Sequence, residues 1–216
     1  MPSYADEMAA RLPTGLPLPD EFRALFDWMD ENGFLMPSQR FAGDRLGLLG
    51  TEDELQSGAV TAIMFRIETP EQARESGEAW FQGTVPDIER RIVPFARTGG
   101  DGSYCAFWLD EEGRQRIVHL GSEGHVCLVG ETPLDFLRFC AIGYGEISGD
   151  GLGDPDSPPD GEARAANTAY RAWLTERYRV SIPKSAREIV GAIPEGRVGE
   201  TSDDPFWLWV SKHQGW

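Results

Sequence analysis

The sequence predicts an α+β fold, in which an antiparallel β-meander packs with helices and is followed by a C-terminal helical extension. Three apolar segments of strand length, which follow one another closely, indicate the meander. The loops between them, residues 110–113 and 121–124, are polar, contain glycine and are four residues long, as is typical of hairpins. The predicted strands are Tyr104–Leu109, Gln115–Leu120 and His125–Val129.

The clearest predicted helix covers Pro19–Asn32. Apolar side chains recur there at intervals of three and four residues, which places them on one face of a helix. Two acids, Asp20 and Glu21, lie in the first turn, where the helix dipole favours negative charge, and Gly33 follows as a stop. The apolar positions are Phe22, Leu25, Phe26 and Met29.

Two further helices are predicted from their starting residues. Thr69-Pro-Glu-Gln72 and Thr132-Pro-Leu-Asp135 each place a capping threonine before a proline, with a second capping side chain three residues on. We expect the first of these helices to end near Gly77 and the second to run through Ile142.

Three shorter segments complete the predicted α+β region. Leu46-Gly-Leu-Leu49 has the length of a short strand, and Val60–Ile67 is a nearly continuous apolar run of strand length. The segment Ile92–Ala96 leads into a glycine-rich turn, residues 97–102, before the meander. A tight turn that needs positive φ explains these glycines better than a phosphate-binding loop, because a strand follows rather than a helix.

The C-terminal part of the sequence has a different character. We predict an α+β domain over residues 1–147, an acidic Gly/Pro linker over 148–161, and a helical extension over 162–216 that packs on the domain. Within the extension, helices are expected at Glu162–Tyr178, at Pro183–Ile193 and from Asp204 onward. The aromatic run Phe206-Trp-Leu-Trp209 is expected to be a packing anchor.

Composition excludes several classes of partner. The chain has 216 residues, with 36 Asp and Glu against 20 Lys and Arg, so its formal net charge is −16. Nucleic acids and anionic membranes both attract clustered Lys and Arg, so neither is expected as a partner. With no apparent signal peptide or membrane span, and with three cysteines that we expect to be buried and reduced, the sequence predicts a cytoplasmic protein.

A catalytic or metal site is not expected. His119, His125 and Cys127 were the best candidate metal ligands, but pairing Leu120 with His125 would turn the two histidines to opposite faces of the sheet. A register slip of one residue would reunite them. No spacing typical of a zinc site is present, and the acids of residues 150–160 lack the order of a calcium loop. We therefore predict no catalytic residues, no metal and no cofactor.

The order of elements resembles that of the SUKH superfamily. The resemblance covers residues 16–143: a proline-led helix that starts Leu18-Pro-Asp-Glu-Phe, the stretch Ile92–Gly102, and a meander strand ending Ile117-Val-His-Leu. The helix that begins Thr132-Pro-Leu-Asp-Phe-Leu then follows. Most of the likeness rests on Pro94, Phe95, Gly99, Gly100, Asp101, Phe136 and Leu137.

This resemblance implies an α+β fold and a binding function. The superfamily includes a fungal regulator of cell-wall assembly, and its bacterial members are largely immunity proteins of polymorphic toxin systems. These immunity proteins neutralise a toxin domain, often a nuclease, by binding it. The superfamily has no known catalytic residues, so the resemblance assigns none to this chain.

The leading hypothesis is a cytoplasmic protein that masks a basic partner, most plausibly a nuclease toxin. Acids in the meander loops would mimic phosphate groups and meet the basic cleft of the partner, and Trp108 would be an aromatic anchor. Ordinary solvated turn residues would look the same in the sequence. The alternatives are a regulatory or scaffold protein that binds a cellular enzyme, and an unrecognised hydrolase. The candidate acids are Asp101, Asp110, Glu111, Glu112 and Glu123.

Overall fold

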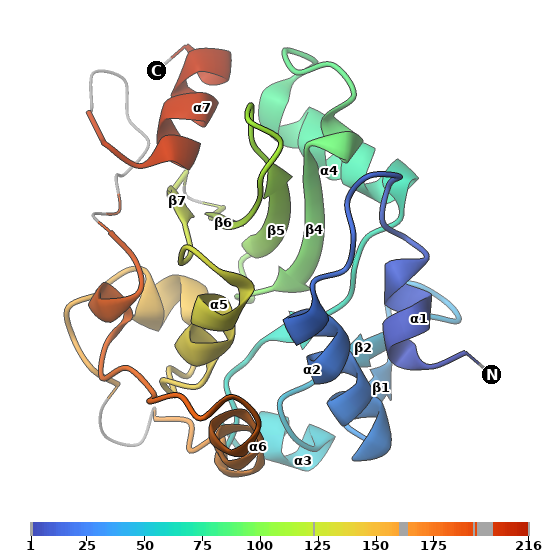
Figure 1. Ribbon diagram of the computed structural model, residues 1–216, viewed down its shortest axis with the longest axis vertical. Helices are drawn as coiled ribbons and strands as arrows, with labels where there is room; N and C mark the ends of the chain where they lie inside the picture. The colour runs from blue at the N-terminus through green and yellow to red at the C-terminus, as the bar shows by residue number, and fades with distance from the viewer. Residues whose placement is uncertain (1, 123, 160–163, 192, 194–200, 216) are drawn as a thin grey trace.

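A computed structural model describes residues 2–122, 124–159, 164–191, 193 and 201–215. Its centre is one antiparallel sheet whose seven strands, within these residues, lie side by side in chain order (Figure 1). The strands are β1 (Leu35–Pro37), β2 (Arg45–Gly47), β3 (Met64–Phe65), β4 (Ile92–Arg97), β5 (Tyr104–Leu109), β6 (Gln115–Leu120) and β7 (Val126–Leu128).

Helices surround this sheet, so the predicted α+β fold is confirmed. The α-helices are α1 (Tyr4–Ala9), α2 (Asp20–Glu31), α3 (Glu52–Gln56), α4 (Pro70–Phe81), α5 (Pro133–Cys140), α6 (Thr168–Tyr178) and α7 (Pro205–Gln214). Shorter turns are the 3₁₀-helices η1 (Ile88–Arg90) and η4 (Ala186–Glu188) and the π-helix η2 (Ile147–Gly151). No helix of the described chain is long and apolar enough to cross a membrane.

The predicted helix starts are confirmed. Thr69 and Thr132 each accept a hydrogen bond from the backbone N–H three residues on, and the side chains of Gln72 and Asp135 complete the two capping boxes. Helix α4 runs past Gly77, where we expected it to end. Gly77 is buried there and lets Ile88 approach closely, so its missing side chain provides space for packing and not a helix stop.

The inner face of the sheet carries the larger hydrophobic core. Helices α1, α2, α5 and α6 cover it and contribute buried side chains. At its centre, the ring of Phe22 on α2 lies 4.8 Å from Phe95 on β4 and 5.0 Å from Phe107 on β5. Phe136 of α5 stacks on Phe22 from the other side at 5.7 Å. The predicted apolar stripe of α2 therefore holds this core together.

The outer face carries a second core, covered in part by α4, η1 and α7. Phe206 and Trp209 of α7 pack on Trp108 of β5, with ring centroids 5.1 and 5.7 Å away, and Trp209 also contacts Phe81 of α4. The C-terminal aromatic run is thus a packing anchor, as predicted, although Leu208 within it is exposed. Figure 1 shows α7 beside β7, far along the sheet from α1 and α2.

Two predicted strands are shorter than expected. The segment 46–49 contributes only its first part to β2, and of the run 60–67 only Met64 and Phe65 pair as a strand. The start of that run makes other bonds, because the backbone N–H of Thr61 donates to the buried side chain of Asn167 at 2.8 Å. A partner more than a hundred residues away in the chain thus takes the place of a strand neighbour.

The predicted helix over 183–193 is wrong: within its described residues only the 3₁₀ turn η4 forms. Side-chain oxygens accept hydrogen bonds from two backbone N–H groups at the start of this segment. The Ala186 N–H donates to the Tyr144 hydroxyl at 2.8 Å, and the Lys184 N–H donates to Glu188 at 2.7 Å. The helix predicted from residue 162 starts at Thr168, after Asn167 in the left-handed region (φ 48°).

The predicted linker, residues 148–161, packs over much of the part that the structure describes. Its first residues belong to η2, and Leu152 is 3% exposed within the inner core. Further along, the carbonyl of Ser157 accepts a hydrogen bond from the Tyr144 hydroxyl, and Asp156 pairs with Arg187. Residues 160 and 161 lie outside the described residues.

Candidate partner-binding surfaces

The candidate acids of the meander do not form one surface. Consecutive strands of an antiparallel sheet run in opposite directions, so their turns alternate between its two ends. The β4–β5 turn, residues 98–103, and the β6–β7 turn therefore share one end, with Asp101 in the first of them. The β5–β6 turn, which carries Asp110, Glu111 and Glu112, lies at the other end. Glu123 lies outside the described residues.

Asp110 is a structural residue of the β5–β6 turn, which corrects its expected role as a contact. Its side chain is 3% exposed and accepts hydrogen bonds from the backbone N–H groups of Glu112 and Arg114. It also forms ion pairs with Arg114 at 2.7 Å and Arg116 at 3.1 Å. Although partial burial opposes ionisation, these bonds from Arg114 and Arg116 outweigh it and hold the pKa of Asp110 below its ordinary value.

The other two acids of this turn are exposed but already have cationic neighbours. Glu111 pairs with Lys212 of α7 at 3.1 Å, and Glu112 pairs with Arg114 at 2.8 Å. Together with Arg116, these cations balance the three acids of the turn. The β5–β6 turn therefore offers a basic partner little net negative charge.

Trp108 is buried, so the expected aromatic anchor is corrected as well. It is 3% exposed, beneath Phe206 and Trp209 of α7. Trp108 occupies a position on the outer face of the sheet. The C-terminal helix covers that position, and the local pattern around residue 108 gives no sign of this.

Asp101, the single acid of the β4–β5 turn, forms no ion pair within 4.0 Å among the described residues. Asp101 accepts hydrogen bonds from the N–H and hydroxyl of Ser103 and from the hydroxyl of Ser122, at 2.7 to 2.9 Å. Burial opposes ionisation of Asp101, but these bonds outweigh it and keep its pKa below the ordinary value. The carboxylate of Glu146 joins the same turn and accepts from the Gly100 N–H at 2.6 Å.

A third acid completes this cluster, because Asp150 accepts a hydrogen bond from the backbone N–H of Glu146. None of the three forms an ion pair within 4.0 Å among the described residues. We refer to Asp101, Glu146 and Asp150 as the acidic turn cluster. Glu146 and Asp150 were not among the predicted contacts, because Asp150 lies within the predicted linker and Glu146 just before it, some forty-five residues from Asp101 in the chain.

Strands β6 and β7 pair in a register that is shifted by one residue from the expected one. Leu120 pairs with Val126, not with His125, so His119 lies directly across from Cys127 on the inner face. His119 is buried, its Nε2 lies 3.2 Å from the Thr98 hydroxyl, and burial lowers its pKa to about 4. Among the described residues, no group of three or more His, Cys, Asp and Glu side chains has the arrangement of a metal site.

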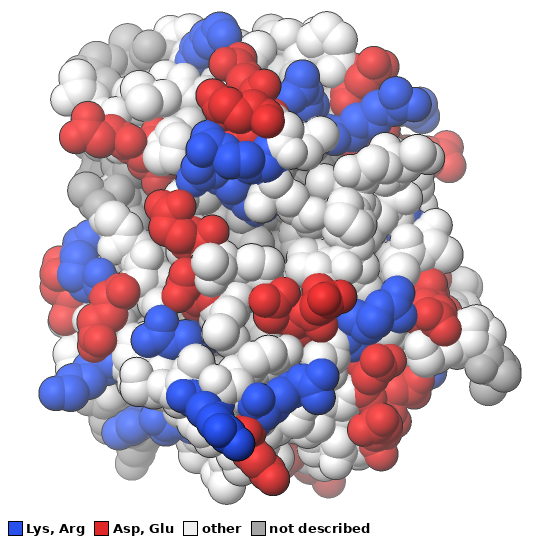
Figure 2. Space-filling view, in the orientation of Figure 1, with Lys and Arg blue, Asp and Glu red and all other residues white. Residues whose placement is uncertain are grey.

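Acids and bases are interspersed on the face drawn in Figure 2, which shows no single acidic field there. What the residues define is an α+β protein whose two meander ends differ in charge balance. No family model matches the chain, and neither a curated protein nor a solved structure matches it. Only this chain's own residues therefore indicate its function.

Proposed function

We propose that this chain is a non-catalytic binding protein that neutralises a basic partner by occlusion, as an immunity protein of the SUKH type does with a toxin domain. Two features support the proposal: the order of helix, meander and helix that resembles that superfamily, and the net charge of −16. A negative field of this size accelerates encounter with a basic protein and disfavours nucleic acid.

The observation that carries the proposal is the acidic turn cluster. Asp101 is held ionised by three hydrogen bonds from Ser103 and Ser122, and no cation pairs with the cluster among the described residues. Carboxylates held in this way can receive Lys or Arg from a partner without first breaking an internal ion pair. In the proposed complex, they occupy the place that phosphates take in the active cleft of a nuclease.

The β5–β6 turn offers a matched control. Glu111 and Glu112 are exposed acids of the same meander, but Lys212 and Arg114 already neutralise them. E111Q/E112Q removes two negative charges, and the cluster variant D101N/E146Q removes the same number. A difference between the two sets of variants therefore reports on location and not on net charge.

The test uses co-expression with the product of the neighbouring reading frame. The variant D101N/E146Q keeps an acceptor oxygen at each position but removes two charges, as many as the control variant removes. We expect it to lose protection of the host and to slow association with the partner about tenfold at low salt, an effect that shrinks as ionic strength rises. The variant E111Q/E112Q should protect as well as the unchanged protein.

If both variants lost protection equally, total charge would explain the effect, and the acidic turn cluster would be rejected as the contact surface. A harmless neighbouring product, together with pull-downs that recover only a cellular enzyme, would reject the immunity function in favour of a regulatory or scaffold protein. Thermal denaturation of each variant separates lost binding from lost folding.

A further inference from the structure

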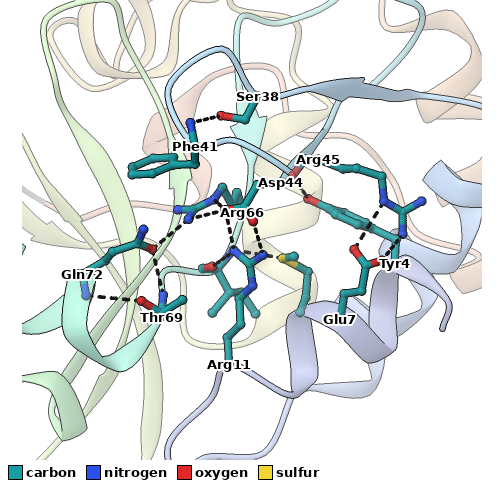
Figure 3. A network of polar contacts seen from close by, with 12 residues as sticks. Tyr4, Glu7, Arg11, Ser38, Phe41, Asp44, Arg45, Arg66, Thr69 and Gln72 are labelled. Carbon is teal, nitrogen blue, oxygen red and sulfur yellow. Dashed lines mark hydrogen bonds and ion pairs between the residues drawn. The ribbon is translucent and has the colours of Figure 1, made fainter. Parts of the chain in front are cut away.

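Arg66 anchors the β1–β2 loop over the outer face of the sheet (Figure 3). Its side chain is 6% exposed, and its Nε donates to Asp44 of the loop at 2.6 Å. The Nη2 of the same guanidinium donates to Gln72 of α4 at 2.7 Å, and the ring of Phe41 lies 3.9 Å from its central carbon. One buried cation thus joins the loop, the sheet and a helix.

Further contacts hold this arrangement in place. Asp44 also pairs with Arg11, at the end of α1, at 2.9 Å. Gln72 belongs to the capping box of α4, so its position is determined by the start of that helix. The loop is therefore held in its position before any ligand arrives, which lowers the entropic cost of binding next to it.

Between this loop and the outer face lies a cavity of about 430 Å³, within the usual range for small-molecule sites of roughly 300–1,000 Å³. Met36, Leu46 and Met64 supply apolar walls from β1, β2 and β3. The alternation of residues 64, 66 and 68 turns Met64, Arg66 and Glu68 to the same side of the chain, and all three line the cavity.

The cavity also has a polar group without a partner. Tyr104 of β5 lines it, and its hydroxyl is buried with no hydrogen-bond partner among the described residues. Burying a hydroxyl donor without an acceptor is unfavourable, so an acceptor from a ligand would stabilise it. Tyr104 lies directly across from Arg97 of β4, another lining residue.

The charge of the cavity is opposite to that of the protein. Three arginines, Arg40, Arg66 and Arg97, line it with a single carboxylate, Glu68. Arg40 and Arg97 are exposed and form no ion pair within 4.0 Å among the described residues. Burial raises the pKa of Glu68, which makes the ionised form of this carboxyl less favourable than it is in water. A basic, partly apolar cavity on a chain with net charge −16 favours an anion with an apolar body.

We propose that this cavity binds a small organic carboxylate with an apolar body. The methionine and leucine side chains contact the body, while Arg97, Arg40 and the Tyr104 hydroxyl meet the carboxylate. This site borders the acidic turn cluster, because Gly102 of the β4–β5 turn also lines the cavity, but it uses other side chains and carries the opposite charge. Its existence depends neither on a toxin partner nor on the immunity function.

The test is titration calorimetry of the full chain with 2-naphthylacetate, together with two related probes. 2-Naphthylacetamide keeps the body but lacks the charge, and acetate keeps the charge but lacks the body. We expect the naphthylacetate ion to bind at least about tenfold more tightly than either, because charge-assisted hydrogen bonds contribute more than neutral ones.

Variants then locate the site. Y104F removes one oxygen atom and should weaken binding of the naphthylacetate ion about three- to tenfold while leaving the melting temperature unchanged or higher. R97Q should weaken it about tenfold. R177Q, which removes an exposed arginine of α6, is the matched control and should bind as the unchanged protein does.

Three results would overturn the proposal: equal affinity for the acid and its amide, undiminished binding by both Y104F and R97Q, or no binding at millimolar concentration. A peptide with an apolar C-terminal residue is tested alongside. Binding of that peptide without binding of naphthylacetate would assign the cavity to a protein chain end and reject the small-molecule site. None of these outcomes bears on the acidic turn cluster.

Discussion

The two faces of the sheet are built differently. The inner face is filled by phenylalanine rings that meet at 4.4 to 6.4 Å, with Phe22 at the centre of the cluster. Where the inner face also buries tyrosines, their hydroxyls donate to backbone carbonyls, as Tyr4 does to Phe65 and Tyr170 to Leu137. On the outer face, three polar atoms of aromatic side chains are buried without a partner among the described residues. They are the Tyr104 hydroxyl and the indole nitrogens of Trp108 and Trp207.

This difference separates two roles within one sheet. Phenylalanine has no polar atom to satisfy, so the rings around Phe22 contribute hydrophobic stability without a hydrogen-bonding penalty. Tyr and Trp bury similar area but leave a donor in need of an acceptor. We infer that the inner face provides most of the stability. The outer face carries the cavity and helix α7, where substitutions should lower the free energy of unfolding by less.

Removing the central inner ring should have the largest effect. F22A should lower the free energy of unfolding by about 3–5 kcal/mol, because a large buried ring leaves a cavity among Phe95, Phe107 and Phe136. Urea denaturation measures this loss. The control L208A removes a side chain of α7 that is 50% exposed and should change the value by less than about 0.5 kcal/mol. Similar losses in both would contradict the central role of Phe22 in the inner core.

Acidification should act on the inner face through His119. Burial lowers its pKa from 6.5 to about 4, so between these values the unfolded chain binds the proton and the folded chain does not. The free energy of unfolding should therefore fall by about 3 kcal/mol as the pH drops from about 6.5 to 4. Denaturation at several pH values should show a smaller fall in H119Q. An identical pH dependence in H119Q and the unchanged protein would reject this role.

The smallest of the three effects concerns the outer face and its helix α7. Asp204 accepts hydrogen bonds from the N–H groups of Phe206 and Trp207 at the helix start, and from Leu128 at the edge of β7. D204A should cost about 1–2 kcal/mol, a range typical of a lost helix cap. Hydrogen exchange should accelerate about tenfold or more in the amides of α7 but not in those of α2. D204N keeps one acceptor oxygen and should show a smaller change, whereas uniform acceleration across both helices would mean that α7 does not open separately.

The features predicted correctly depend on neighbours in the chain. The bounds of β5 and β6, the stripe of α2 and the capping boxes at Thr69 and Thr132 all follow from residues a few positions apart. The candidate site was predicted only in part. Asp101 keeps its place as an exposed acid, while Asp110 and Trp108 are buried, and the SUKH resemblance and the immunity function are proposals for experiment.

By itself, the sequence determined the class of fold, the order of helices and meander strands, and the acidic charge that disfavours nucleic acid as a partner. Only the tertiary structure decided which acids are free and where a cavity lies. Trp108 is covered by Phe206, almost a hundred residues later, and Arg66 meets Asp44 and Gln72 from separate elements. Such contacts depend on how distant segments pack, and local periodicity and capping carry no information about that packing.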